Sequence, residues 1–155
     1  MDDKDRQIIA ALQANGRLTN QELSEQVNLS PSPCLRRLRM LEAAGVIRGY
    51  TAVIDEEAYG LPVTALVRIR LQKHDDATVA AFEAAIADMD AVLDCYVMTG
   101  SDDYLLRVLV ASLKDYEDFV RSKLHPIAGI AAIDTSFAYG IVKRSTVFPQ
   151  GKRSG

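Results

Sequence analysis

Residues 30–42 read SPSPCLRRLRMLE and combine an apolar stripe with a concentration of positive charge. Leucine recurs at every third position, at Leu35, Leu38 and Leu41, and arginines fill positions between them. A helix needs only one apolar stripe to dock on its own domain, so its opposite face is free for another contact. The basic face of this segment is therefore a candidate binding surface.

On a helix, Ser32, Arg36 and Arg39 share an outward stripe with Arg37 beside it, and the three leucines are expected to face inward. Arginine suits DNA recognition because its guanidinium makes bidentate contacts with guanine edges and charge-assisted contacts with phosphates. Arginine clusters are also common on solvated helix surfaces, and the cluster alone is better explained that way. The neighbouring elements must decide between the two.

The charge of the chain is unevenly distributed. Its 155 residues have a net charge of -3, yet residues 30–50 contain four Lys or Arg and one Asp or Glu. An acidic protein with one basic helix can bind a polyanion locally without adhering to it everywhere.

Two further helices are predicted before this segment. Apolar residues from Asp5 onward predict a helix that stops near Gly16, and Thr19 with Glu22 has the form of a capping box that starts a second helix. Ser30 and Pro31 are typical of the start of a third helix, which is expected to end at Gly45. The β-branched run at 46–54 then predicts a strand or hairpin wing, which completes a winged helix-turn-helix and makes DNA binding the favoured reading.

From Pro62 onward the apolar period changes to two, which is typical of strands. Strands are expected at 63–72, 92–98, 104–110 and 130–142, with helices after Asp75 and Ser112. The order β-α-β-β-α-β is that of a ferredoxin-like split motif, whose right-handed crossovers place both helices on one sheet face. The other face is left for a partner or solvent.

The predicted fold class is α+β, an N-terminal winged helix-turn-helix followed by a ferredoxin-like βαββαβ effector domain. The expected divisions are a DNA-binding domain at 1–50, a linker strand at 51–61, an effector-binding and oligomerisation domain at 62–148, and a loose tail at 149–155.

Three motifs resemble one family of proteins. They are GRLTNQEL at 16–23, LSPSPCLRRLRMLEAAGVIRGYTAVID at 29–55 and GSDDYLL at 100–106. In order and spacing they are similar to the leucine-responsive/asparagine-regulator (Lrp/AsnC, feast/famine) family of prokaryotic transcription factors, over almost the whole chain from Asp2 to about Phe148. The resemblance implies a double-stranded DNA operator as partner, an amino acid or related metabolite as effector, and dimers that assemble further, often into octamers.

The resemblance also implies site residues. The DNA-facing set is Ser30, Ser32, Pro33, Arg36, Arg37 and Arg39. The effector set is the loop Gly100, Ser101, Asp102, Asp103 and Tyr104, together with Ser136, Ala138 and Gly140, which face that loop across a contact between dimers. In the family pattern an acid directly follows the glycine, whereas here Ser101 stands in that place and Asp102 follows.

The loop has some support from its residues alone. Glycine at Gly100 permits close backbone approach to a ligand, and the carboxylates of Asp102 and Asp103 could hold an ammonium group. The same residues are ordinary in a hairpin turn, and without the resemblance the turn is the better interpretation.

The remaining reactive side chains are sparse. His74 and His125 stand alone at expected element ends, and Cys34 and Cys95 lie far apart inside apolar patterns, so we expect structural roles, no metal and no cofactor. No nucleophile with an adjacent base and no phosphate-binding glycine loop is evident, so no catalytic residue is expected. The first residues are charged and no segment has about 18 consecutive apolar residues, which predicts a cytoplasmic protein without a membrane partner.

Two alternatives to a transcription regulator remain. Ferredoxin-like domains also serve as metabolite-binding modules or small enzymes, and a metal- or redox-sensing repressor would use the cysteines and histidines. An enzyme has no evident use for a winged helix with an arginine stripe, and the cysteines lack metal-ligand spacing.

Overall fold

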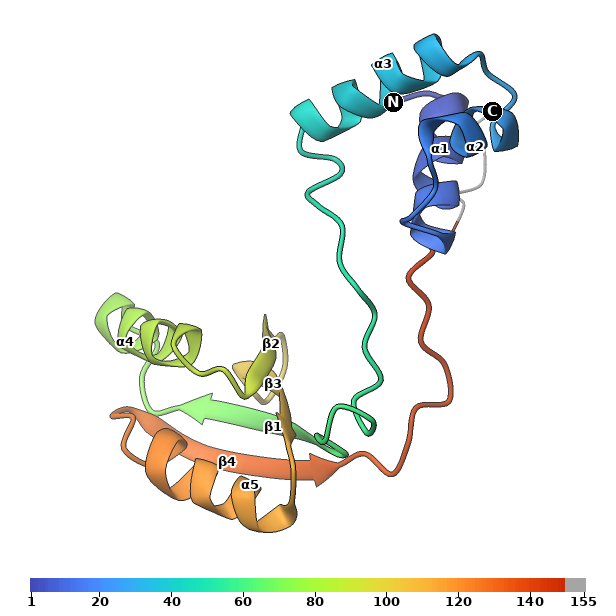
Figure 1. The fold of residues 1–155 in the computed structure, drawn as a ribbon. Coiled ribbons are helices and arrows are strands. Elements are labelled where there is room, and N and C mark those ends of the chain that lie inside the picture. The colour runs from blue at the N-terminus through green and yellow to red at the C-terminus, as the bar shows by residue number, and fades with distance from the viewer. Residues whose placement is uncertain (150–155) are drawn as a thin grey trace. The chain divides into compact units, whose positions relative to one another are not determined.

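The computed structural model describes residues 1–149, which form two compact units (Figure 1). The first unit, the head, comprises Met1–Val53 and the described residues from Val142 on. The second unit, the sheet domain, comprises Ile54–Ile141.

The head contains the three expected helices, α1 (Asp3–Ala14), α2 (Asn20–Gln26) and α3 (Pro31–Ala43). The predicted capping box of α2 is confirmed: the backbone N–H of Glu22 donates to Thr19 Oγ1, and the backbone N–H of Thr19 donates to Glu22 Oε2. Both bonds satisfy donors that a helix start otherwise leaves without partners. Asn28, with φ of 52°, turns the chain from α2 into α3.

The three helices share one small core. Its buried members are Ile8, Leu23, Val27, Cys34 and Leu41. The inward stripe of α3 is therefore Cys34, Leu38 and Leu41, and the prediction that Leu35 faces inward is wrong: Leu35 is only half-buried and does not belong to this core. At 3.6 residues per turn, Leu38 and Leu41 lie within about 40° of Cys34 around the helix, whereas Leu35 lies about 100° away.

No strand forms between α3 and the sheet domain. Residues 46–54, expected as the strand of a wing, form no β ladder, and residues 51–61, expected as a linker strand, hold a turn at 56–60. β-Branched residues favour a strand only where a neighbouring strand supplies hydrogen bonds and packing, and Val53 and Ile54 stay exposed here.

The described part of the C-terminal segment returns to the head. Thr146 Oγ1 donates to the backbone carbonyl of Gln13 at 3.0 Å, and the backbone N–H of Phe148 donates to Gln13 Oε1 at 3.1 Å. Residues 142–149 consequently group with the head and not with the sheet domain, in which the sequence placed residues up to 148. Of the expected loose tail at 149–155, residues 150–155 lie outside the described residues.

The sheet domain confirms the predicted ferredoxin-like order. Its strands are β1 (Val63–Leu71), β2 (Val92–Val97), β3 (Tyr104–Val110) and β4 (Ile130–Phe137), with α4 (Asp76–Ala87) and α5 (Leu113–Phe119) between them and a π-helical turn at Val120–Leu124. The strands lie in the order β2-β3-β1-β4, and all neighbouring pairs are antiparallel. The last strand ends at Phe137 and does not reach 142 as expected.

Both helices of the sheet domain cover the same face of the sheet. Phe82 of α4 and Phe119 of α5 belong to one buried cluster with alternating residues of the central strands, such as Val67 of β1 and Leu106 of β3. The side chains between them in sequence, including Arg68, point to the opposite face. The sheet thus buries one face against its own helices.

Candidate nucleic-acid interface and effector site

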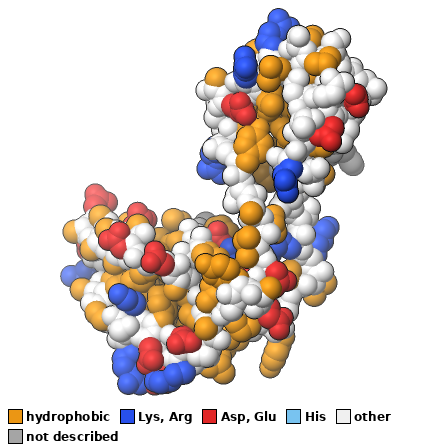
Figure 2. Space-filling view, viewed as in Figure 1, with side chains coloured by type: hydrophobic (Ala, Val, Ile, Leu, Met, Phe, Trp, Pro, Cys, Tyr) orange, Lys and Arg blue, Asp and Glu red, His pale blue; other side chains and the backbone are white. Residues whose placement is uncertain are grey.

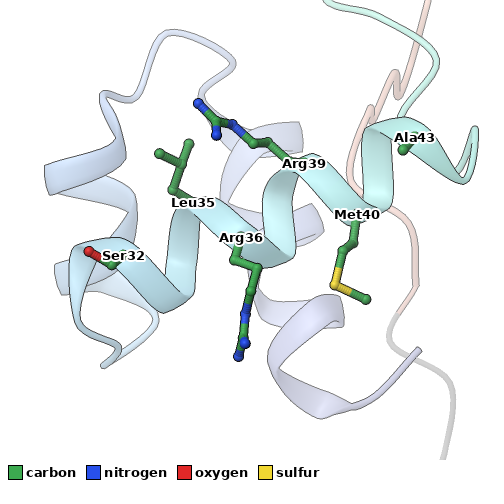
Figure 3. A pocket seen from close by; sticks show the side chains of 6 residues that line it. All are labelled: Ser32, Leu35, Arg36, Arg39, Met40 and Ala43. Carbon is green, nitrogen blue, oxygen red and sulfur yellow. The ribbon is translucent and has the colours of Figure 1, made fainter.

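The outward face of α3 carries two unpaired arginines. Arg36 and Arg39 are exposed, and among the described residues neither makes an ion pair with an acidic side chain. Ser32 lies on the same face, nearer the helix start, as Figure 3 shows. On the face that Figure 2 shows, the head presents hydrophobic side chains between Lys and Arg side chains. This mixture can meet both phosphates and base edges.

Arg37 is held inside the head. Its Nη1 donates to Asp2 Oδ2 at 2.7 Å and to Asp5 Oδ1 at 2.8 Å, which ties α3 to the start of α1. The backbone N–H of Asp5 and the Arg37 guanidinium lower the pKa of Asp2, and the hydrogen bonds to Asp2 and Asp5 raise the pKa of Arg37. The charge of Arg37 is therefore compensated within the chain.

The start of α3 is exposed as well. Ser30 occupies the N-cap position, but its side chain makes no capping hydrogen bond, and Ser30 and Pro33 are accessible to a ligand. Asn20 Nδ2 of α2 donates to the backbone carbonyl of Pro31 at 3.0 Å, which fixes the start of α3 against α2. Pro31 and Pro33 have no backbone N–H and the N–H of Cys34 donates to the carbonyl of Ser30, so within the first turn Ser32 supplies the backbone N–H that can reach a phosphate oxygen.

A shallow hollow of about 380 Å³ lies along α3. Its lining combines the three polar residues of the outward stripe with apolar side chains that the sequence analysis did not place on this face, and consists of Ser32, Leu35, Arg36, Arg39, Met40 and Ala43. Helical angles of about 100° per residue place Leu35 and Met40 at the two flanks of this face. The regular spacing of the leucines at three residues suggested that Leu35 faces inward, because it ignores the 3.6 residues of a helical turn.

The effector loop joins β2 to β3. Gly100 has φ of 118°, a value that favours glycine, and a Cβ at this position would meet no atom within 4 Å. The loop is closed by the backbone N–H of Met98, which donates to the carbonyl of Asp103 at 2.8 Å. Ser101 is exposed, Asp102 is half-buried, and Ser101 Oγ donates to Asp102 Oδ2 at 3.3 Å. The backbone at Gly100 is therefore open to close approach.

Asp103 joins the loop to the end of β1. Its Oδ2 accepts a hydrogen bond from the backbone N–H of Leu71, and its Oδ1 lies 2.7 Å from Nε2 of His74. The Leu71 N–H, more than His74, lowers the pKa of Asp103 below its ordinary value. Both carboxylate oxygens of Asp103 thus accept hydrogen bonds within the chain, whereas among the described residues the Asp102 carboxylate accepts only from the Ser101 hydroxyl.

Tyr104 is part of the buried core. Its ring lies 4.5 Å, centroid to centroid, from Phe82, and its hydroxyl donates to Glu83 Oε1 at 2.8 Å. Burial, and then the hydrogen bond to Glu83, raises the pKa of Tyr104 to about 12. The Tyr104 side chain therefore fixes the end of the loop to α4.

The second group of predicted effector residues lies at the other end of β1. The backbone N–H of Ala138 donates to the carbonyl of Thr64, whereas the backbone N–H of Asp103 donates to that of Ile69. Five residues of strand separate these two carbonyls, which is roughly 16 Å at the rise of a β-strand. One chain therefore does not bring Gly100 and Gly140 into a single site.

Ser136 lies on the sheet face opposite the helices. Arg68 Nη1 donates to Ser136 Oγ at 3.2 Å and to Asp134 Oδ2 at 3.3 Å. Ala138 and Gly140 follow the end of β4 and are exposed. These residues form an accessible edge of the sheet domain.

The cysteines and histidines of the described residues do not form a cluster. Cys34 is buried in the head, and burial raises the pKa of its thiol. Cys95 is exposed as a residue in the sheet domain, and partial desolvation of its thiol, followed by the charge of Glu83, raises the pKa. Among residues 1–149 no group of three His, Cys, Asp or Glu side chains is placed to hold a metal ion. No helix in that part of the chain combines the length and hydropathy needed to span a bilayer.

Known proteins are similar to this chain over both units. Residues 1–48 match the model of a winged helix-turn-helix DNA-binding domain, and residues 64–148 match the Lrp/AsnC ligand binding domain. The DNA-binding transcriptional activator DecR of Escherichia coli is 37% identical over 149 residues, covering 96% of this chain and 98% of DecR. The Bkd operon transcriptional regulator of Pseudomonas aeruginosa is 40% identical over 138 residues, covering 89% of this chain and 90% of that protein.

A solved structure matches as well. The transcriptional regulator NMB0573 of Neisseria meningitidis, in a complex with L-Met, superposes with a TM-score of 0.92 and 40% identity, covering 96% of each chain. Sequence and fold agree over both units, so the chain belongs to the Lrp/AsnC family of transcriptional regulators.

Proposed function

We propose that the head binds the major groove of operator DNA through Ser32, Arg36 and Arg39, with Ser30 and Pro33 at the phosphate backbone. The observation that carries the proposal is the pair of exposed arginines on α3 that have no acidic partner among residues 1–149. Other arginines of this acidic chain, such as Arg68 and Arg107, are neutralised by carboxylates. Arg37, whose charge is compensated by Asp2 and Asp5, supports this face by fixing α3 on α1.

The effector is an amino acid bound by the loop Gly100–Asp103. The backbone at Gly100 admits close approach, and the Asp102 carboxylate attracts an ammonium group by a charge-assisted hydrogen bond. The complex of the Neisseria relative with L-Met supports an amino acid as the class of ligand. Asp103 and Tyr104 hold the loop in shape and do not lend their polar atoms to the ligand.

The complete effector site needs a second chain. Ser136, Ala138 and Gly140 lie at the end of β1 remote from the loop, so a site built from both groups must combine the loop of one chain with the strand end of another. We infer a homodimer that assembles further, up to an octamer, in which a bound amino acid changes the arrangement of the heads. The head domain at 1–50 and the effector domain at 62–148 are the two functional parts, supported by the extents of the two matching family models.

We assign the protein a role in the regulation of transcription and not in catalysis. The relatives are named as transcriptional regulators, and the His74–Asp103 pair has no serine or cysteine among its hydrogen-bond partners in the described part of the chain. A small enzyme or a plain metabolite-binding module would leave the α3 arginines without a use. The protein acts in the cytoplasm, where operator DNA is accessible.

Gel-shift titration on a site selected from random DNA tests the DNA-binding proposal. We expect Arg36→Ala and Arg39→Ala each to cost about 1–3 kcal/mol of specific binding if the arginine reads a base, or to lower affinity on all sequences and flatten the salt dependence if it meets phosphate. Arg121→Ala in the sheet domain is the matched control, because Arg121 already pairs with Glu117. Wild-type affinity in the variant lacking both α3 arginines would refute the assignment.

A further inference from the structure

Leu35 is an apolar side chain on the face that we assign to DNA. It is half-buried, lines the hollow on α3, and is absent from the side chains that pack in or against the head core. In Figure 3 it projects from the same side of the helix as Arg39, whereas Arg36 and Met40 project from the other side. Leu35 is therefore partly covered without belonging to the head core, and it borders the hollow on the outward face.

We propose that Leu35 reads a thymine by packing on the 5-methyl group in the major groove, beside the base that Arg39 contacts. The inference rests on the proposed insertion of α3 into DNA and assigns a base preference to that contact. It adds an apolar reading position to the polar contacts of Ser32, Arg36 and Arg39.

The chemistry of the groove identifies the occupant. The major-groove edges of the four base pairs present hydrogen-bond donors and acceptors, and thymine alone adds a methyl group. The leucine side chain has no donor or acceptor, so it gains by covering a methyl group and leaves the polar edge of any other base without a partner. A thymine at this position is therefore favoured over cytosine, adenine and guanine.

The helix also sets where the thymine lies. Leu35 and Arg39 are four residues apart on α3, which corresponds to about 6 Å along the helix axis. Base pairs are stacked at about 3.4 Å, so the thymine lies within about two base pairs of the position that Arg39 contacts. Loss of base discrimination in an Arg39→Ala variant locates that position.

Replacing thymine by deoxyuridine removes only the methyl group and is the test. On the selected site, each thymine of one half-site is changed in turn to deoxyuridine, and the affinities of wild type, Leu35→Ala and Met40→Ala are measured. We expect one thymine whose replacement weakens wild-type binding about fourfold, the effect of exposing one methylene-sized group. The same replacement should not change the affinity of Leu35→Ala and should keep its full effect in Met40→Ala, which trims the other flank of the hollow.

Each comparison is made within one protein, so a general loss of head stability in Leu35→Ala does not imitate the result. Leu35→Val, which removes one methylene, replaces the alanine variant if that variant binds too weakly to titrate. The inference is overturned if no thymine shows a methyl effect in the wild type, or if the effect persists in Leu35→Ala or disappears in Met40→Ala. Failure to select any DNA would overturn the proposed function itself, and this inference with it.

Discussion

Arg36, Arg37 and Arg39 lie within about one turn of α3, yet they meet different surroundings. Arg36 and Arg39 point away from the head, and Arg37 reaches Asp2 and Asp5 of α1. Similar side chains in one short stretch therefore divide between the outward face that we propose for DNA contact and the internal fixing of the helix. The angle around the helix decides which role each takes.

The different roles predict different losses. Arg37→Ala should lower the thermal stability of the head, because it leaves Asp5 partly desolvated without its cation, and the loss should shrink at high salt. Arg36→Ala should leave stability nearly unchanged and lower DNA affinity. Thermal unfolding followed by circular dichroism checks the first effect, and an Arg37→Ala head as stable as the wild type would show that the pairs contribute nothing.

Asp103 predicts a pH dependence of the sheet domain. Its pKa is lowered in the folded chain, mainly by the Leu71 N–H, so the ionised form stabilises the fold. This contribution is fully present above the ordinary pKa of 3.8 and is lost as the pH falls through the lower folded value. The stability difference between wild type and Asp103→Asn should be constant from pH 7 to about 5 and should shrink below that. Urea unfolding at a series of pH values measures it, and a difference independent of pH down to 2 would contradict the role.

At the scale of elements, the starts of α2 and α3 illustrate how similar sequence signals produce different contacts. Thr19 and Ser30 both occupy N-cap positions, but only Thr19 accepts a hydrogen bond from its helix. The side chain of Ser30 is left free at the exposed start of α3. The residue at N3 is Glu22 in α2 and Pro33 in α3, and proline has no backbone N–H to donate to the cap.

This contrast gives a matched pair of variants. Thr19→Ala should destabilise the head by about 1 kcal/mol because it removes the cap of α2. Ser30→Ala should cost no more than a few tenths of that, because no capping bond is lost. Urea unfolding of the full chain, followed by the helix signal, compares the two. Equal losses would show that the free conformation of Ser30 does not persist in solution.

At the scale of the whole molecule, the two groups of proposed effector residues lie at opposite ends of β1. The loop Gly100–Asp103 and the segment 136–140 can meet only if two chains come together. If both groups form one effector site, as we propose, ligand binding and assembly are linked, because the ligand binds a surface that the separated chain lacks. The open sheet face, with its row of Arg68, Asp134 and Ser136, leaves room for such contacts.

Mixing two defective variants tests the shared site. Gly100→Leu disables the loop and Gly140→Leu disables the strand end, so neither homo-oligomer should bind the amino acid found in a thermal-shift screen. After joint refolding, random assembly should restore about a quarter of the sites, because those combine an intact loop with an intact strand end. Calorimetry counts the sites. Absence of any recovery in mixed oligomers of confirmed composition would place the two groups in separate sites.

Local sequence patterns determined most elements of this chain. The capping box at Thr19 and Glu22, the period-two run of β1 and the order of helices and strands along the sheet domain could be predicted, because each depends on neighbours within a few residues. Family motifs identified the α3 arginines and the glycine loop. Both groups could be identified because each lies in one contiguous stretch of sequence.

Contacts between distant residues determined the rest. The sequence did not reveal that Arg37 donates to Asp2, that Asp103 accepts a hydrogen bond from the Leu71 N–H, or that residues 46–54 lack a partner strand. Each of these depends on whether a residue distant in sequence lies nearby in the fold. The position of Leu35 on the outward flank became clear only once the structure showed that the inward stripe of α3 starts at Cys34, whose side chain is buried in the head core. The separation of Gly100 from Gly140 follows from strand pairing, which brings each group to an opposite end of β1 by long-range hydrogen bonds that no local pattern specifies.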